Sequence, residues 1–258
     1  MLPPVINIFE KAVRKAGKIL IRDFGEIENL QIQSKGLGDF VTNTDIRVEK
    51  ILIETIKYYY PEVSFITEES GEISGNEIKI VIDPIDGTSN FIHGIPIVGI
   101  VVARIYENEI TDSVIFNPII NDFFWASKGK GAWCNNKRLR VSKRHDLSSC
   151  LIGTGIPFGK KTNERFSKQL INISSKTAGV RRLGAASIDL AYVSAGKLDG
   201  YWEEGLNLWD IASGILMVKE AGGKVSQPSG EVWTFNSGNI LASNQLIHEE
   251  LQQNLTLL

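Results

Sequence analysis

The chain has 258 residues, of which 43% are hydrophobic and 22% are charged. Lysine and arginine together number 28 against 30 aspartate and glutamate residues, so the net charge is −2. This balance excludes a global attraction to nucleic acid or to an anionic membrane, and the length allows one large domain or two closely joined lobes that act on a small molecule.

The first residues, Met1 to Asn7, lack a basic stretch followed by an apolar core and a cleavage site, so we expect a cytoplasmic protein. No window approaches the roughly twenty apolar residues that a membrane helix needs, so we expect no membrane partner. Cys134 and Cys150 belong to no C-x-x-C pair, which predicts reduced thiols and no structural zinc.

Residues 5–24 carry apolar side chains at helical spacing and predict an amphipathic helix. Residues 27–33 alternate weakly like a strand and lead into the glycine-rich segment 34–39. We expect that segment to be a mobile loop that can close over a site. A second helical pattern covers residues 46–60, with Thr44 or Asp45 as its N-cap.

Two predicted strands each end in acidic residues. Residues 64–67 precede Glu68 and Glu69, and residues 80–82 precede Asp83. If the first of these stretches stays extended, Glu69 points away from Glu68, so we leave Glu69 out of the candidate site.

The second of these strands breaks into Asp83-Pro84-Ile85-Asp86-Gly87. Pro84 fixes its own φ and Gly87 is conformationally permissive, so the two acids are expected on a rigid charged turn. Two carboxylates so close repel each other. Either one takes up a proton, or a hard cation such as Mg²⁺ lies between them.

The residues after the acids could bind a phosphate. Gly87, Thr88 and Ser89 present successive N–H groups, which suit an anion if they open a turn or a helix. The alternative is that Asp, Pro and Gly here form an ordinary surface turn. Likewise, Asp45 and Asp210 taken singly are explained as helix caps.

The remaining elements divide the chain into two lobes. Strands at 97–105, 110–116 and 123–126 predict an antiparallel meander, followed by a loop or hairpin at 128–136. The second half alternates strand and helix: strands at 150–154, 180–183 and 198–203, helices at 163–176, 185–195 and 209–221, and strands near Val225 and Ile240. We predict an α+β lobe over residues 1–145, with most of the metal ligands, and an α/β lobe over residues 146–258 that completes the site.

Two motifs carry a resemblance to a known family. Residues 83–90, DPIDGTSN, and residues 209–214, WDIASG, followed by Glu220-Ala-Gly-Gly223, resemble the signatures of the inositol monophosphatase superfamily of Mg²⁺-dependent, lithium-sensitive phosphatases. The resemblance covers nearly the whole chain. It implies a layered α-β-α-β-α sandwich, in which an antiparallel sheet half is followed by a smaller sheet between helices, and a homodimer.

The resemblance also implies the metal site, with two to three Mg²⁺ ions. Glu68, Asp83 and the carbonyl of Ile85 match the ligands of a first metal. Asp83, Asp86 and Asp210 match those of a second, and a third, weaker ion is expected near Glu68. Thr88, partnered by Asp45, would orient a metal-activated water for in-line attack on a phosphate, and Glu68 would help to take its proton.

The substrate side is implied by the same match. The expected contacts are Ile85, Asp86, Gly87, Thr88, Arg181, Gly184, Ala185, Ala186, Glu203 and Asp210. Arg181 has the alternative of a surface ion pair, with Arg182 as the inward residue. Bacterial relatives often read Arg-Pro before Trp-Asp, but this chain has Asn207-Leu208, which leaves the substrate open.

We therefore predict a Mg²⁺-dependent phosphatase of inositol monophosphate type that acts on a small phosphorylated polyol or sugar. The alternative substrates are histidinol phosphate, fructose 1,6-bisphosphate and a 3'-phosphonucleotide. An alternative of a different class is a regulatory protein in transcription complexes, as some bacterial relatives are, without direct nucleic-acid binding. A structural Ca²⁺ site is less favoured, because the acids do not follow the EF-hand spacing.

Overall fold

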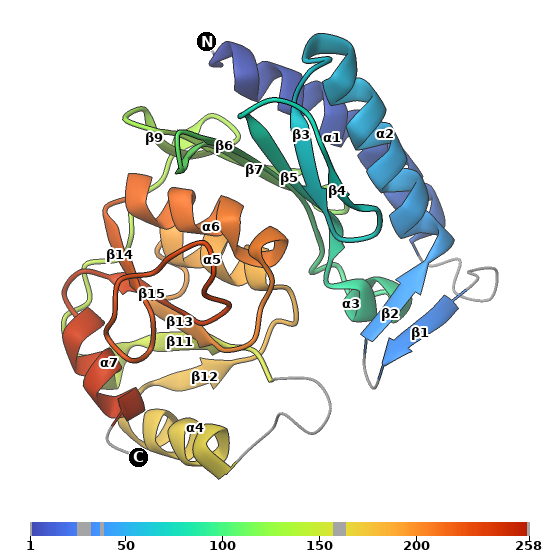
Figure 1. The fold of residues 1–258 in the computed structure, drawn as a ribbon. Helices are drawn as coiled ribbons and strands as arrows, with labels where there is room; N and C mark the ends of the chain where they lie inside the picture. The colour runs from blue at the N-terminus through green and yellow to red at the C-terminus, as the bar shows by residue number, and fades with distance from the viewer. Residues whose placement is uncertain (1, 25–31, 37–38, 157–163, 257–258) are drawn as a thin grey trace.

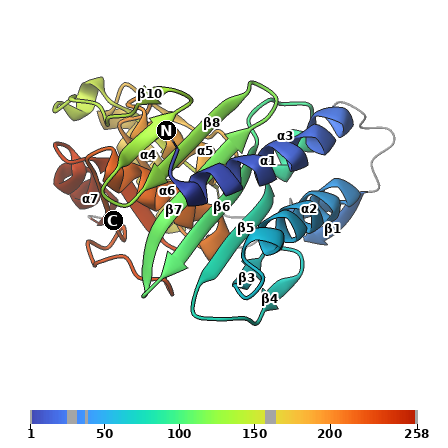
Figure 2. The ribbon, with the colours of Figure 1, turned by 90° about the horizontal axis from the view of Figure 1, so that it is seen from above.

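The computed structural model describes residues 2–24, 32–36, 39–156 and 164–256, with only the backbone described for residues 32–36 and 39–41. Helices α1 (Pro4–Asp23) and α2 (Asn43–Tyr59) pack on each other and on one face of a large sheet (Figures 1 and 2). The predicted first helix is confirmed. The predicted N-cap of the second helix is wrong, because α2 begins three residues earlier and Thr42 is its N-cap.

The structure also corrects the prediction that the glycine-rich segment 34–39 is a loop. Strand β1 (Ile32–Gly36) pairs antiparallel with β2 (Asp39–Thr42), so that Ser34 lies opposite Phe40 and Gly36 opposite Asp39. Backbone pairing overrides the low strand propensity of glycine here, where we expected a loop. Residues 37–38 and the predicted strand portion 27–31 lie outside the described residues.

The large sheet has eight strands in the order β10-β9-β8-β7-β6-β5-β3-β4. Its strands, in chain order, are β3 (Ser64–Thr67), β4 (Gly71–Ile73), β5 (Lys79–Asp86), β6 (Gly99–Tyr106), β7 (Glu109–Asn117), β8 (Asp122–Ser127), β9 (Gly131–Cys134) and β10 (Lys137–Arg138). All neighbours pair antiparallel except β3 and β5, which are parallel. The meander is confirmed, but sequence reasoning did not predict β4.

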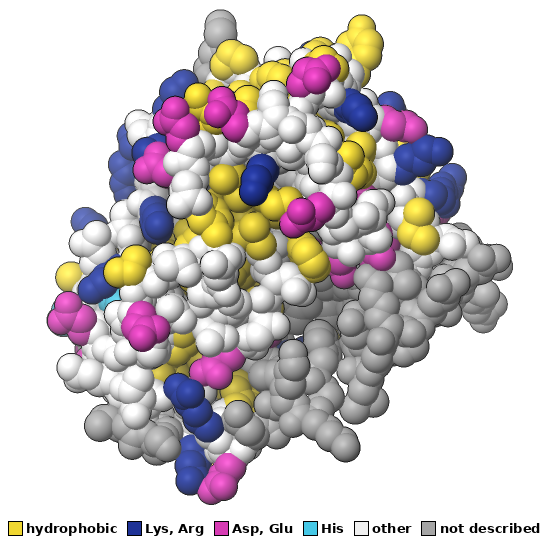
Figure 3. Space-filling view, viewed as in Figure 1, with side chains coloured by type: hydrophobic (Ala, Val, Ile, Leu, Met, Phe, Trp, Pro, Cys, Tyr) yellow, Lys and Arg dark blue, Asp and Glu magenta, His cyan; other side chains and the backbone are white. Residues whose placement is uncertain are grey.

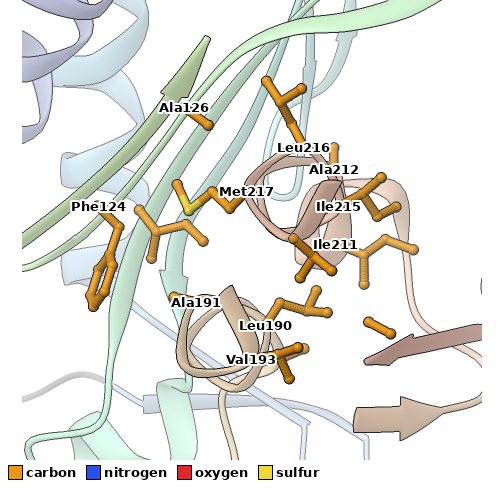
Figure 4. Packing of buried hydrophobic residues seen from close by; sticks show 14 of the residues in the cluster. Phe124, Ala126, Leu190, Ala191, Val193, Ile211, Ala212, Ile215, Leu216 and Met217 are labelled. Carbon is orange, nitrogen blue, oxygen red and sulfur yellow. The ribbon is translucent and has the colours of Figure 1, made fainter. Parts of the chain in front are cut away.

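Helices α5 (Ala186–Ser194) and α6 (Leu208–Glu220) form the middle layer between this sheet and a second one (Figure 1). Both are apolar nearly all round, as expected for helices covered on two sides. Figure 4 shows Leu190 and Val193 of α5 and Ile211 of α6 packed together in the core. The two helices approach closely at Gly214, where a Cβ atom would lie 2.4 Å from the Cβ of Leu190.

The second sheet has five strands in the order β12-β11-β13-β15-β14, and helices α4 (Glu164–Lys176) and α7 (His248–Thr256) cover its far face (Figure 1). The strands are β11 (Leu151–Thr154), β12 (Gly179–Arg181), β13 (Gly200–Glu203), β14 (Gly223–Ser226) and β15 (Ile240–Asn244). Strands β12, β11 and β13 are parallel, and the rest pair antiparallel. Sequence reasoning missed α7, whose apolar signal is little more than Leu251 and Leu255.

These layers are the predicted α-β-α-β-α sandwich, in which two mixed sheets lie between helices. Helix α6 contacts strands of both sheets, so the division at residue 145 stays a prediction. On the face seen in Figure 3, charges of both signs surround an apolar centre, in keeping with the balanced composition. Within the described residues, none of the helices combines the length and apolar character required to cross a membrane.

Candidate active site

A pocket of about 330 Å³ lies where the carboxyl ends of β3 and β5 meet the amino ends of α5 and α6. Among the described residues that line it are eleven of the predicted site residues: Glu68, Asp83, Ile85, Asp86, Gly87, Thr88, Gly184, Ala185, Ala186, Glu203 and Asp210. Two predicted residues are not part of this lining, namely Asp45 and Arg181. The tertiary fold therefore gathers most of the set from four separate stretches of chain.

The central motif is built on an irregular strand and not on a turn that follows a strand, which corrects our expectation. Strand β5 continues to Asp86, and its pairing with β6 shifts register between Asp83 and Asp86. Pro84 within this interval has no N–H for the ladder, which favours such a bulge. The Ile85 N–H instead donates to the Asp83 carboxylate at 3.0 Å. The bulge thereby presents both acids on one edge.

Gly87 ends the motif in the left-handed region, with φ of 89°. A Cβ atom at this position would lie 2.9 Å from the carbonyl oxygen of Ile97 and 3.1 Å from the Cβ of Ala185, so only glycine fits. The short helix α3 (Thr88–Ile92) starts directly after it. Gly87, Thr88 and Ser89 line the pocket together with the Gly184–Ala186 loop.

Asp45 serves the helix and the site at once. One carboxylate oxygen accepts hydrogen bonds from the N–H and the hydroxyl of Thr42, which completes the capping box of α2. The other oxygen accepts from the Thr88 hydroxyl at 3.3 Å, and that hydroxyl also lies 2.9 Å from the Ile85 carbonyl oxygen. Asp45 is fully buried, and burial raises its pKa to about 6.

Asp210 combines a cap and a site position in the same way. Its carboxylate accepts from the Asn207 N–H at 2.6 Å in the capping box of α6. Across the pocket, Asp86 accepts from the N–H of Ser187 at 2.7 Å and from the Ser187 hydroxyl. Sequence reasoning missed Ser187, because nothing local marks it as a partner of a residue about a hundred positions away.

Glu68 and Glu69 separate as expected, since Glu68 lines the pocket and Glu69 is not part of the described lining. The turn that carries them is held by a residue we did not predict. The buried carboxylate of Glu49 on α2 accepts hydrogen bonds from the backbone N–H groups of Glu69 and Ser70, at 2.9 and 3.0 Å, and from the Ser70 hydroxyl.

The acids of the pocket have raised pKa values, because they are buried close to one another. Burial raises the pKa of Asp83 well above its usual value, and the charges of Glu68 and Asp86 raise it further. Burial also raises the pKa of Asp86 to about 6, an effect that the Ser187 hydrogen bonds oppose. The pKa of Asp210 is raised by burial and then by the charge of Asp86. These carboxylates therefore favour protons or a cation between them.

The donor chemistry fits a hard divalent cation. The pocket offers carboxylate oxygens and the Ile85 carbonyl, and its described lining holds no histidine or cysteine. As the described side chains lie, no three acids, histidines or cysteines are close enough together to enclose an ion. Glu68, Asp83, Asp86 and Asp210 line one pocket without enclosing an ion, and the charges that raise the pKa of Asp83 are those that a cation would neutralise.

The far side of the pocket differs from the prediction at one arginine. Both arginines are exposed, but Arg182 lines the pocket, whereas Arg181 is not part of the described lining and donates to the carbonyl of Val180. Arg182, which we named as the alternative to Arg181, is therefore the arginine at the pocket. Asn90 supports this wall, because its amide donates to the carbonyls of Ile97 and Leu183, each at 2.8 Å.

Glu203 lies beside two further polar groups that sequence reasoning did not single out. It accepts a hydrogen bond from the Tyr201 hydroxyl, and burial raises its pKa to about 7. Asp189 of α5 is buried next to it, and burial together with the charge of Glu203 raises the pKa of Asp189. The sequence did offer a signal for Asp189, because an acidic residue within the otherwise apolar sequence of α5 is unusual. Gly155 leaves room for the Glu203 carboxylate, which a Cβ atom there would overlap.

Comparison with known proteins gives one consistent result. A family profile described as "Inositol monophosphatase family" matches residues 1–256. A protein of Caulobacter vibrioides named "Inositol-1-monophosphatase" is 45% identical over 251 residues, which cover 95% of this chain and 98% of the relative. A protein of Escherichia coli K12 named "Nus factor SuhB" is 40% identical over 258 residues, with 98% and 96% covered.

The fold comparison agrees. The crystal structure of the extragenic suppressor protein SuhB from Bartonella henselae superposes with a TM-score of 0.96 at 41% sequence identity. The superposition covers 98% of this chain and 99% of the other. The similarity therefore extends over both sheets and the helices between them.

Proposed function

The chain belongs to the inositol monophosphatase family, and from that membership we propose that it is a Mg²⁺-dependent hydrolase of phosphate monoesters, with an inositol monophosphate as its substrate. The observation that carries this proposal is that Glu68, Asp83, Asp86 and Asp210 line one pocket together with Gly87 and Thr88. Oxygen ligands and an anion cradle side by side suit a phosphate that binds together with a hard cation.

The acids and the Ile85 carbonyl would hold two to three Mg²⁺ ions, in the ligand sets that the family resemblance implies. When bound, the ions would neutralise charge on the phosphate and acidify water. The N–H groups of Gly87 and Thr88 would hold phosphate oxygens in the same corner. The pocket can thus bind a doubly negative group despite its own acidic wall.

Thr88 and Asp45 would accept the proton that the attacking water releases. The Thr88 hydroxyl donates toward the Ile85 carbonyl and Asp45, so its oxygen lone pairs are free to accept a hydrogen bond from an attacking water. With a pKa of about 6, Asp45 is mostly ionised at neutral pH and can receive a proton that Thr88 passes on. Glu68, which lines the same pocket, would assist.

The remainder of the substrate would lie between the Gly184–Ala186 loop and Glu203. Glu203, with Tyr201 and Asp189 behind it, offers acceptors to hydroxyl groups, which favours a polyol over an apolar leaving group. Arg182, and not Arg181, would contribute a positive charge at this wall. A homodimer and inhibition by lithium are further parts of the proposal, and family membership supports both.

The first experiment measures phosphate release from inositol 1-phosphate, histidinol phosphate, fructose 1,6-bisphosphate and 3'-phosphoadenosine 5'-phosphate, with and without Mg²⁺. We expect Mg²⁺-dependent turnover, highest on inositol 1-phosphate and abolished in Asp83→Asn. A different preferred substrate would revise the specificity. Turnover that persists in chelator, or in Asp83→Asn, would contradict the proposed site.

The names of relatives favour a second candidate function. The Escherichia coli relative is named a Nus factor, in line with the expectation that some relatives act in transcription complexes. The near-neutral charge points to a protein partner in such a complex and not to direct nucleic-acid binding. A pull-down with RNA polymerase tests this role, and recovery that depends wholly on added RNA would contradict it.

A further inference from the structure

We propose that Glu49 is a positioning residue for the metal site, because it fixes the turn that carries Glu68. The inference rests on the proposed function, since it assumes that Glu68 is a metal ligand. It concerns a buried side chain of α2 that is not part of the described pocket lining. The hydrogen bonds of Glu49 come from Glu69 and Ser70, which are not part of the described pocket lining.

The location of Glu49 is unusual for a carboxylate. It lies on the buried face of α2, where Val48, Leu52 and Ile56 pack against the core, and only 1% of its surface is exposed. A buried carboxylate is costly unless hydrogen bonds satisfy it. Here three donors do so, and all three belong to Glu69 and Ser70. Charge-assisted bonds of this kind are about twice as strong as neutral ones.

The bonds act on the chain directly after Glu68. On its other side, the Glu68 N–H donates to the Ile82 carbonyl of β5 at 3.3 Å. The backbone of Glu68 is therefore held by the strand that carries Asp83 and, through the next two residues, by α2. Without Glu49, three donors of the turn lose their partner and the turn is free to relax away from β5.

Helix α2 thereby links two parts of the site. Asp45 and Glu49 are one helical turn apart on the same face. Asp45 contacts Thr88, which follows β5, while Glu49 holds the turn that follows β3. One rigid element thus sets the distance between the group that orients water and the carboxylate that binds metal, which is how supporting residues tune a metal site.

The chain contains a matched control in Glu220, at the carboxyl end of α6. Its carboxylate also accepts two backbone N–H bonds from a tight turn, those of Gly129 and Gly131, each at 2.8 Å. That turn joins β8 to β9, at the opposite end of the sheet from the pocket. Glu220→Gln therefore removes the same kind of contact and the same charge without touching the site.

The test compares wild type, Glu49→Gln, Ser70→Ala and Glu220→Gln by calorimetric titration with Mn²⁺ in the absence of substrate, and by the Mg²⁺ concentration that gives half-maximal phosphate release. We expect Glu49→Gln to weaken cation binding by about 10- to 100-fold. Most of kcat should return at saturating Mg²⁺, because the bound ion restores the position of Glu68. Ser70→Ala, which removes one of the three bonds, should weaken binding less, and Glu220→Gln should match wild type.

Cation affinity in Glu49→Gln within about twofold of wild type would overturn the inference, as would an equal loss in Glu220→Gln, which would indicate a general effect on the fold. If Glu49→Gln does not fold, Ser70→Ala decides: reduced affinity supports the inference and wild-type affinity overturns it. Wild-type protein that binds no cation would instead refute the proposed function, and the inference with it.

Discussion

Single residues in this protein carry two functions where the sequence offered two competing explanations. Asp45 and Asp210 were explained either as helix caps or as site residues, and the structure shows each in a capping box while its carboxylate also belongs to the pocket or to Thr88. The cap fixes the side chain in one rotamer. A carboxylate anchored in that way meets its partner at little further entropic cost.

The role of Thr88 is testable at this scale. Thr88→Val keeps the shape of the side chain and removes the hydroxyl that lies between Asp45 and Ile85. We expect kcat to fall on the order of 10²-fold or more, with little change in KM, because the lost contact acts on the attacking water and not on the bound ester.

Steady-state kinetics at saturating Mg²⁺ measure this effect, and Thr88→Ser is the control. Serine restores a hydroxyl at the same position, so kcat should recover most of the loss. An unchanged kcat in Thr88→Val would remove Thr88 from the proton path.

At the scale of elements, the middle helices owe their position to close packing on both sides. Helix α6 carries Asp210 at its amino end and Glu220 at its carboxyl end, and it contacts strands of both sheets. Helix α5 delivers Ser187 to Asp86 from its first turn. The spacing between these two helices therefore decides whether the acids of the two lobes meet at the pocket.

Gly214 sets that spacing, and two effects compete when it is replaced. Alanine in a helix interior is favoured over glycine by about 1 kcal/mol. Its Cβ atom, however, would lie 2.4 Å from the Cβ of Leu190, and overpacking typically costs about 1–3 kcal/mol. Taken together, the two effects should lower the free energy of unfolding of Gly214→Ala by up to about 2 kcal/mol.

Urea unfolding measures this change. Ser174→Ala on the exposed side of α4 is the control, with an expected change within about 0.5 kcal/mol. A Gly214→Ala variant more stable than wild type would show that the α5–α6 contact has room to adjust.

At the scale of the whole molecule, the buried carboxylates of the pocket repel one another when ionised, and this repulsion lowers the stability of the folded chain. Burial raises the pKa of Asp45 and Asp86 to about 6 and that of Glu203 to about 7. Each of these groups binds its proton more tightly in the folded chain than in the unfolded one. Their contribution to stability is present below about pH 4 and is lost as the pH rises to about 7.

The metal-free protein should therefore lose stability between about pH 4 and pH 7, with Asp45 alone accounting for on the order of 3 kcal/mol. The buried His248, whose pKa burial lowers to about 4, acts in the opposite sense, because its contribution is lost as the pH falls below about 6.5. Urea unfolding across this range in chelator measures the decline, and Asp45→Asn should show a shallower one.

Added Mg²⁺ should raise the free energy of unfolding more at pH 7.5 than at pH 5, since the carboxylates must be ionised to bind it. Equal stabilisation at both pH values would show that the titrating acids do not take part in binding.

The sequence by itself determined the elements and the motifs. Helical periodicity located α1, and the alternation of strand and helix located most elements of residues 146–258, because these signals depend on neighbours within a few positions. The residues DPIDG and WD, through their resemblance to the family signatures, pointed to Asp83, Asp86 and Asp210 of the pocket. It failed where local signals were weak, as at β4 and α7, or ambiguous, as at the Thr42 cap and between Arg181 and Arg182.

Only the tertiary structure decided which side chains support the acids. Ser187 meets Asp86 across 101 positions, Asn90 reaches Leu183 across 93, and Glu49 reaches the Glu69–Ser70 turn from another element. Such contacts leave no periodic trace in the sequence, because they depend on how α2, α5 and two sheets stack. The sequence motifs thus named the acids of the pocket, and the packing of distant elements determined what holds them in place.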